Sequence, residues 1–173
     1  MSKGGAGAKA TTAVGTTPNI RAMPKGRFFE DFAVGLRLLH KWGRTFTREE
    51  AIRFATQTMN YNPLWFNLEH AKAEGHPDVV VCPWLVFNVA LGMSVEDVSE
   101  NATALLGYGE MVFHKDVYPG DTVTAESTVL ETRASSSKPD QGILKTATTA
   151  RNQRGETVLT YERTNLIRRR APP

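Results

Sequence analysis

Residues 84–94 are apolar at nearly every position, and this helix-length stretch limits the folds open to the chain. A helix that is apolar on all sides must be covered on all sides. The chain after it is rich in β-branched and aromatic residues, in four runs separated by turn residues: 106–115, 122–132, 143–152 and 157–167. Helices followed by successive strands predict an α+β fold, in which a curved antiparallel meander wraps around one central buried helix.

The chain has 173 residues, of which 40% are hydrophobic, and this is enough for one domain with a sizeable core. Residues 1–25 are rich in Gly, Ala, Thr and Lys, which predicts a disordered or loosely docked tail before a single domain over residues 26–170. The tail lacks the apolar core of a secretory signal. Residues 79–93, the longest apolar stretch, fall short of the roughly 20 residues that cross a bilayer, so no membrane partner is expected.

Charge and cysteine content narrow the possible functions. Cys82 is the single cysteine, which excludes an intramolecular disulfide and favours a cytoplasmic location. The net charge of +3 comes partly from Arg168, Arg169 and Arg170, which we interpret as a solvated terminus. Basic and aromatic residues do not alternate, so no nucleic-acid partner is expected. Neither a Gly-rich phosphate loop nor a cluster with metal-ligand spacing is present, so we expect no metal or redox cofactor.

Two helices are predicted before the apolar stretch. Thr47 and Glu50 have the spacing of a capping box, which opens a helix that leads the chain to Asn60. Asn67 is predicted to cap a second short helix that ends at Gly75. Residues 58–67 therefore lie on the connection between the two helices. Pro83 is predicted in the first turn of the apolar helix, where its missing N–H is not needed.

The connecting segment, TMNYNPLWFN over residues 58–67, resembles the active-site signature of MaoC-type (R)-specific enoyl-CoA hydratases. That signature usually reads Gly-Asp-x-Asn-Pro-Leu-His, so Asn60 stands at the aspartate position and Trp65 at the histidine position. Five further segments are similar to the subgroup of mesaconyl-CoA hydratases, also called β-methylmalyl-CoA dehydratases: 26–32, 92–97, 106–108, 117–121 and 152–156. The resemblance implies a hotdog fold that forms a homodimer, or a heteromer with another hotdog subunit.

The resemblance also implies a reaction. In family members with the full pair, the aspartate and histidine hold a water against the double bond of an acyl thioester and transfer its protons. A backbone N–H at the start of the central helix binds the thioester oxygen. Neither Asn60 nor Trp65 exchanges a proton near neutral pH, so Asn60 is expected to orient water or substrate and Trp65 to wall the pocket. Pro83 has no N–H, which passes the oxyanion role to the amide of Trp84.

Each of these candidates also has a structural interpretation. Asn60 is alternatively a turn residue that bonds its own backbone, and Trp65 an aromatic core residue. His70 is the histidine closest to the motif and the best substitute base among the histidines, although its structural interpretation, a residue on a solvated helix face, is the simpler one. Tyr61 is assigned to substrate binding. Cys82 is assigned to the substrate site as well, either as a nucleophile or as a small buried hydrophobe.

The sequence leaves other functions open. The chain is alternatively a non-catalytic, substrate-binding subunit of a heteromeric dehydratase, whose Asp/His-bearing partner performs the chemistry. A hotdog thioesterase is a further alternative, with Glu110 as the carboxylate near the thioester carbon. The expected substrate carrier is CoA or the phosphopantetheine of an acyl-carrier protein, whose phosphates would meet basic side chains. The candidates for that contact are Lys115, Arg151 and Arg163, the last of which is predicted near a strand end.

Overall fold

The computed structural model describes residues 25–170, so most of the predicted tail over residues 1–25 lies outside the described part. Its elements, in chain order, are the 3₁₀ turn η1 (Phe29–Asp31), β1 (Arg37–Leu39), β2 (Arg44–Thr45), α1 (Arg48–Gln57), the 3₁₀ turn η2 (Pro63–Trp65), α2 (Leu68–Ala73), α3 (Pro83–Ser94), the π-helical turn η3 (Val95–Ser99), β3 (Ala102–Phe113), β4 (Thr122–Ala134), β5 (Gln141–Asn152) and β6 (Thr157–Arg168). No helix in this part is long and apolar enough to span a bilayer.

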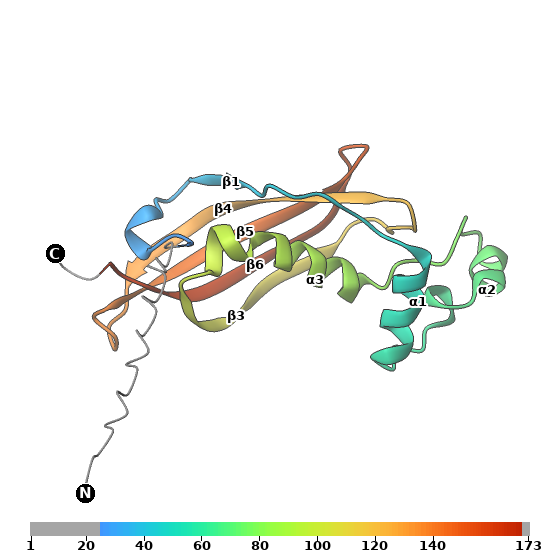
Figure 1. Cartoon of the computed structure of the whole chain (residues 1–173), viewed down its shortest axis with the longest axis horizontal. Helices are drawn as coiled ribbons and strands as arrows, with labels where there is room; N and C mark the ends of the chain where they lie inside the picture. The colour runs from blue at the N-terminus through green and yellow to red at the C-terminus, as the bar shows by residue number, and fades with distance from the viewer. Residues whose placement is uncertain (1–24, 171–173) are drawn as a thin grey trace, which may run out of the picture.

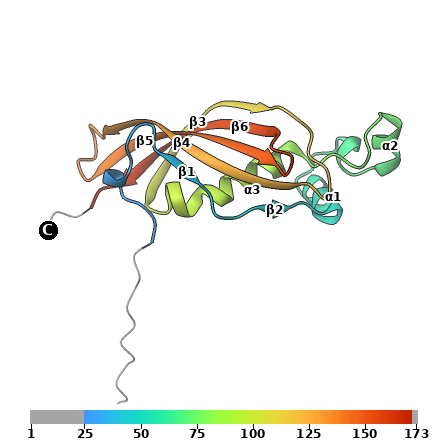
Figure 2. The same cartoon turned by 90° about the horizontal axis from the view of Figure 1, so that it is seen from above.

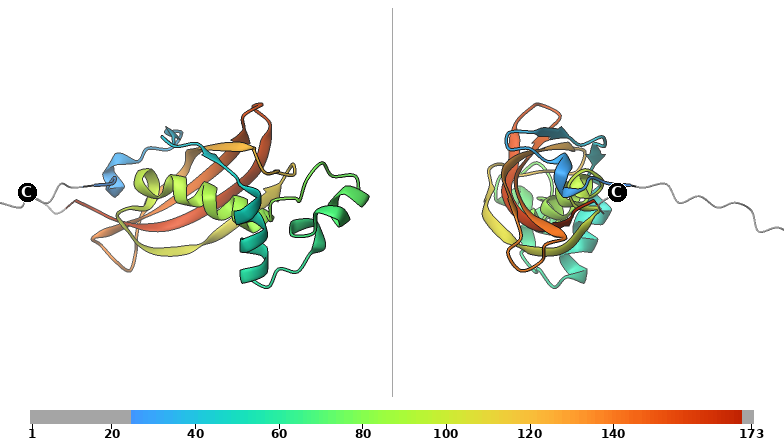
Figure 3. Two further views of the ribbon diagram at one scale, coloured as in Figure 1. Left: turned by 45° about the vertical axis from the view of Figure 1, so that its right-hand side comes forward. Right: turned by 90° about the vertical axis from the view of Figure 1, so that its left-hand side faces the viewer.

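The six strands form one antiparallel sheet in the order β1–β4–β5–β6–β3, with the short β2 also paired to β4. The predicted curved sheet and its four long strands are confirmed, and Figure 3 shows the sheet bending around α3. The strand order differs from a simple meander, because β3 pairs with β6 and not with β4. In the described part of the chain β3 therefore forms an outer edge of the sheet.

Helix α3 lies along the concave face of the sheet, as Figures 1 and 2 show in two directions. Its buried residues are Val86, Phe87, Ala90 and Ser94, which face core residues of β4, β5 and β6. Trp84, on the same helix, is 47% exposed. The predicted central helix packed in the curved sheet is confirmed, although part of its surface, including Trp84, is not covered within the single chain.

The uncovered side of α3 continues onto β3. Four large apolar side chains of this edge strand are exposed by 38% to 52% of their surface, namely Leu105, Leu106, Tyr108 and Phe113. A long edge strand with free backbone groups and apolar side chains is a template for pairing with another chain. Contiguous exposed apolar surface of this kind marks an interaction site.

The two helices before α3 begin where their caps predict. Thr47 Oγ1 accepts a hydrogen bond from Glu50 N–H at 3.3 Å, and the Glu50 carboxylate accepts one from Thr47 N–H at 3.0 Å. Asn67 caps α2 by accepting from His70 N–H at 3.1 Å. Figure 1 shows α1 and α2 together at one end of the molecule, next to the start of α3.

The carboxyl end of the described chain is exposed to solvent but paired with η1. Arg169 donates to Glu30 at 3.1 Å, and Arg170 donates to Asp31 at 2.6 Å. These bonds hold the segment after β6 against η1. All three arginines are exposed, in agreement with a solvated terminus, although two of them are also paired with acidic residues of η1.

Asp121 ties together the two turns that flank β4 and β5. Asp121 is 5% exposed. Its carboxylate accepts hydrogen bonds from Tyr118 N–H at 3.0 Å, from the Gln153 amide at 2.8 Å and from the Arg154 guanidinium at 3.0 Å. Burial alone raises the pKa of Asp121, but these hydrogen bonds outweigh it and hold the pKa below its ordinary value. The ionised form is thus favoured in the folded chain.

We expect Asp121→Asn to lower the free energy of unfolding at pH 7 by ~1–2 kcal/mol. The loss is not larger because Arg154 is half exposed and solvent screens its attraction to Asp121. A depressed folded pKa adds stability above the unfolded pKa, and this stability is lost as pH falls through the folded pKa. Urea unfolding at several pH values should show that the difference between wild type and variant shrinks under acid. A variant equal to wild type at pH 7 would contradict this role.

Candidate functional site

The start of α3 is the first part of the candidate site. Cys82 precedes the helix, Pro83 is its first residue, and the first intrahelical turn closes with Leu85 N–H donating to Cys82 O at 2.8 Å. The N–H of Trp84 has no backbone carbonyl partner within residues 25–170, and neither Trp84 nor Cys82 is among the residues that line the cavity beside the helix start. A helix N-terminus favours negative charge, so this N–H group is suited to a carbonyl oxygen that becomes anionic.

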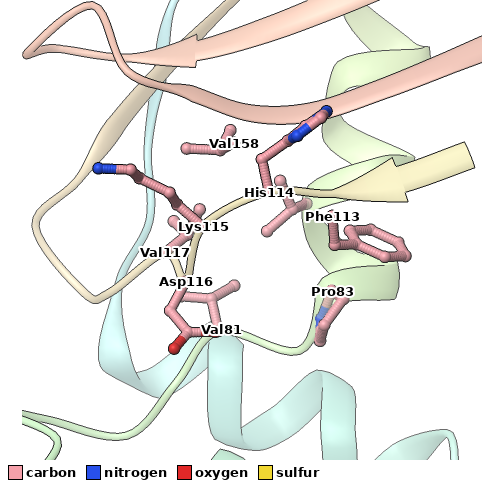
Figure 4. Close-up of a pocket in the computed structure, with 9 residues that line it drawn as sticks. Val81, Pro83, Phe113, His114, Lys115, Asp116, Val117 and Val158 are labelled. Atoms are coloured by element: carbon pink, nitrogen blue, oxygen red, sulfur yellow. The ribbon is translucent and has the colours of Figure 1, made fainter.

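A cavity of about 230 Å³ opens beside this helix start. Figure 4 shows side chains converging on it from the start of α3, the end of β3 with the loop after it, and β6. Val81 N–H donates to Val117 O at 2.8 Å, which fixes the segment before α3 against that loop. The lining residues are Val81, Pro83, Val86, Phe113, His114, Lys115, Asp116, Val117 and Val158.

The polar part of the wall consists of three consecutive residues after β3. His114 Nε2 lies 2.8 Å from Thr160 Oγ1, and the Lys115 ammonium donates to Glu156 at 2.5 Å. Asp116 lies 3.8 Å from the ring of His76. Neither His114 nor Asp116 was predicted as a site residue. Their position at the end of the predicted run 106–115 is the one sequence feature that distinguishes them.

The signature segment lies next to the helix start through its backbone. Val80 N–H, just before α3, donates to Leu64 O in η2 at 2.9 Å. Asn60 is half-buried at the end of α1, and its amide donates to Thr58 Oγ1 at 2.9 Å. Trp65 ends η2 and is half-buried. Neither Asn60 nor Trp65 lines the cavity beside Pro83.

The other predicted site residues are dispersed. Tyr61 is 61% exposed and meets Phe66 edge to face. His70 is half-buried on α2, and Glu110 is exposed on β3. Burial raises the pKa of the Cys82 thiol, although the N–H groups of Trp84 and Leu85 lower it in part, so the thiol stays protonated at neutral pH. The ring of Trp84 packs edge to face against Phe113, with 5.8 Å between centroids.

The basic residues considered for phosphate binding do not cluster. Lys115 lines the cavity at the start of α3. Arg151 is exposed and lines a separate hollow, and its guanidinium donates to Thr157 Oγ1 at 2.6 Å. Arg163 is buried in the middle of β6 and not near a strand end, so that prediction is wrong. Its position on the helix-facing side of the sheet follows from the alternation of the strand.

A Ser–His–Asp arrangement lies elsewhere in the core. His40 Nε2 is 2.8 Å from Ser127 Oγ, and His40 Nδ1 is 3.0 Å from Asp97. Ser127 is 1% exposed and is also bonded to Thr148 Oγ1 at 2.8 Å. The hydroxyl is therefore both occupied and inaccessible to a substrate, and the arrangement is a structural network. Within residues 25–170, no group of three His, Cys, Asp or Glu side chains is placed to hold a metal ion.

Comparisons with known proteins agree on one family. A family model described as mesaconyl-CoA hydratase matches residues 11–173. The mesaconyl-CoA hydratase of Haloarcula marismortui is 36% identical over 149 residues, which are 86% of this chain and 42% of that protein. The solved structure of a MaoC domain protein dehydratase from Chloroflexus aurantiacus is 31% identical with a TM-score of 0.81, over 92% of this chain and 43% of that one. The resemblance and the hotdog fold inferred from the sequence are thereby confirmed.

The chain spans less than half the length of these relatives. The same holds for a Mycobacterium tuberculosis structure described as a double hotdog fold, which is 26% identical with a TM-score of 0.74 and is 46% covered. That match includes 86% of this chain, whose described residues form one sheet around one central helix. One hotdog unit here therefore corresponds to part of a larger protein there.

Proposed function

The chain belongs to the mesaconyl-CoA hydratase family, and we propose that it adds water to, or removes it from, the α,β bond of an acyl-CoA thioester. The structural observation that supports this proposal is the start of α3, where the Trp84 N–H has no backbone carbonyl partner within residues 25–170 and a cavity opens beside Pro83. In hydration, water adds its oxygen to the β-carbon while the α-carbon takes up a proton. The thioester oxygen gains enolate character meanwhile, and the Trp84 N–H stabilises that charge.

The proton carriers differ from the usual pair. Asn60 does not line the cavity beside Pro83 in the single chain, and its assignment rests on its place in the signature: its amide would orient the attacking water, while an ionisable group transfers the proton. Of the histidines, His114 lies in the wall of the cavity at the start of α3, whereas His70 lies on α2. We therefore assign the proton transfer to His114 in preference to His70. A His114→Gln variant should lose turnover in steady-state kinetics, whereas His70→Gln should keep it.

The working unit contains two hotdog units. This proposal is supported by the uncovered face of α3, by the free apolar edge of β3 and by the double length of the relatives. A second copy of this chain supplies the other unit in a homodimer. The absence of the usual Asp/His pair favours one alternative, a heteromer in which another hotdog subunit performs the proton transfers.

Incubation of the purified protein with a panel of enoyl-CoA and 3-hydroxyacyl-CoA thioesters, read by mass spectrometry, separates these functions. Gain or loss of one water by the thioester supports the hydratase. Release of free CoA without hydration supports a thioesterase instead. Turnover that requires an added Asp/His-bearing hotdog protein assigns the chain to the partner-dependent subunit.

A further inference from the structure

Two carboxylates beside the cavity at the start of α3 are fully occupied by hydrogen bonds. Asp121 accepts from one backbone N–H and from two side chains of the turn between β5 and β6. Glu156 accepts from the Asn152 amide at 2.8 Å and from the Lys115 ammonium at 2.5 Å. Arg154 adds a third bond at 2.9 Å, and together these bonds lower the pKa of Glu156 to about 2. Both carboxylates hold turns together, so neither is available to a substrate.

Asp116 is different, because it lines the cavity and its carboxylate accepts no hydrogen bond from any group in residues 25–170. The ring of His76 lies 3.8 Å away, which is too far for a hydrogen bond. Nδ1 of that ring is instead 2.9 Å from Tyr118 Oη. The Asp116 side chain is 53% exposed, so its oxygens are open to a water or a substrate in the cavity. Asp116 is thus the one carboxylate in the cavity wall, and its acceptor sites are unused.

The loop that carries Asp116 is nevertheless held in place by its backbone. Val81 N–H donates to Val117 O at 2.8 Å, directly after Asp116. His114 N–H donates to Val158 O at 2.9 Å, two residues before Asp116. Figure 4 shows the side chains of His114 and Asp116 leaving the loop in different directions, with His114 toward β6. A fixed loop that presents two titratable side chains to one cavity is suited to proton transfer at two different atoms.

We propose that Asp116 takes the proton from the attacking water and that His114 gives a proton to the α-carbon. The inference rests on the proposed function, to which it adds the second proton carrier. As the water oxygen bonds to the β-carbon, a water proton passes to the Asp116 carboxylate and the π electrons of the double bond move to the α-carbon. The protonated ring of His114 then donates to the α-carbon. Asp116 afterwards releases its proton and His114 takes one up, so the net change is the addition of one water.

The other polar groups near the cavity are less suited to take this proton. The Lys115 ammonium is a donor without an acceptor site, and it is bonded to Glu156. The Asn60 side chain is an amide, which can orient a water but does not hold its proton. The Cys82 thiol is buried and does not line the cavity. The loop over residues 114–116 therefore carries the two kinds of group that the signature segment lacks, a carboxylate and an imidazole.

Steady-state kinetics with mesaconyl-CoA tests the role of Asp116. Asp116→Asn, which keeps the shape of the side chain but cannot take up a proton, should lower kcat by about 100-fold or more and leave KM within a few-fold. Asp116→Glu keeps a carboxylate and should regain part of the loss. The matched control is Asp140→Asn, which changes an exposed aspartate in the turn between β4 and β5 and should keep full activity. Circular dichroism verifies the fold of each variant.

Exchange of the α-hydrogen of butyryl-CoA, a saturated thioester, in deuterium oxide tests the division of roles apart from hydration. Asp116→Asn should retain this exchange, whereas His114→Gln should lose it. Three results would overturn the inference and leave the proposed hydration intact: full hydration by Asp116→Asn, a loss confined to its KM, or loss of its exchange. A wild-type protein that hydrates mesaconyl-CoA without exchanging the α-hydrogen would overturn the division of roles. A wild-type protein that hydrates no thioester would refute the proposed function, and the role of Asp116 with it.

Discussion

Asn60→Ala is expected to lower kcat/KM for hydration of mesaconyl-CoA by roughly 100-fold, because a water that is no longer oriented rarely reaches the β-carbon in a reactive geometry. Asn60 is half-buried and its amide bonds only Thr58 among the described residues, so the fold should remain intact. Steady-state kinetics measures the loss, and circular dichroism verifies the fold.

Thr58→Val is the matched control for Asn60. It removes the hydroxyl that accepts the Asn60 amide hydrogen bond but keeps the amide itself. If Asn60 serves only the local turn, both variants should behave alike. If it orients water, Thr58→Val should retain most of the activity. Full activity in Asn60→Ala would refute the role of Asn60 in the reaction.

The double variant Leu105→Glu, Leu106→Glu should convert the assembly into monomers near 19.1 kDa and abolish hydration. Both side chains are about half exposed on the free edge of β3, at 51% and 52%. Charges on an edge strand oppose pairing with another sheet, and burying two carboxylates in an interface without partners is strongly unfavourable. Sedimentation velocity measures the association state directly.

Leu130→Glu is the control for this edge. Leu130 is 39% exposed on β4, a strand with neighbours on both sides, so a charge there should leave the assembly unchanged. A double variant that still sediments as wild type would place the interface elsewhere on the molecule. A wild-type protein that sediments as a monomer would refute the two-unit assembly without partners.

Much of the fold follows from short-range signals in the sequence. The capping box at Thr47 and Glu50, the Asn67 cap and the proline in the first turn of α3 each depend on neighbouring residues, and each is confirmed. The four long strands follow from β-rich runs between turn residues. Their boundaries shift by a few residues, as at β3, which begins at Ala102 before the predicted run.

The features that the sequence did not predict depend on pairing across the sheet. The position of β3 beside β6 is a long-range choice that no local pattern specifies. Residues 84–94 correctly predicted the central helix, but not that its Trp84 side would stay uncovered within the single chain. The cavity wall at His114 and Asp116 likewise arises only when β3, β6 and α3 are brought together.

The most direct test of the hydratase is to incubate the purified protein alone with mesaconyl-CoA in oxygen-18 water and to determine the mass of the thioester. We expect a CoA thioester that has gained one water, with the heavy oxygen on the β-carbon, and we expect Asn60→Ala to lose most of this product. Free CoA with heavy oxygen in the released acid, or an unchanged thioester with the protein folded and assembled, would contradict the proposed hydration.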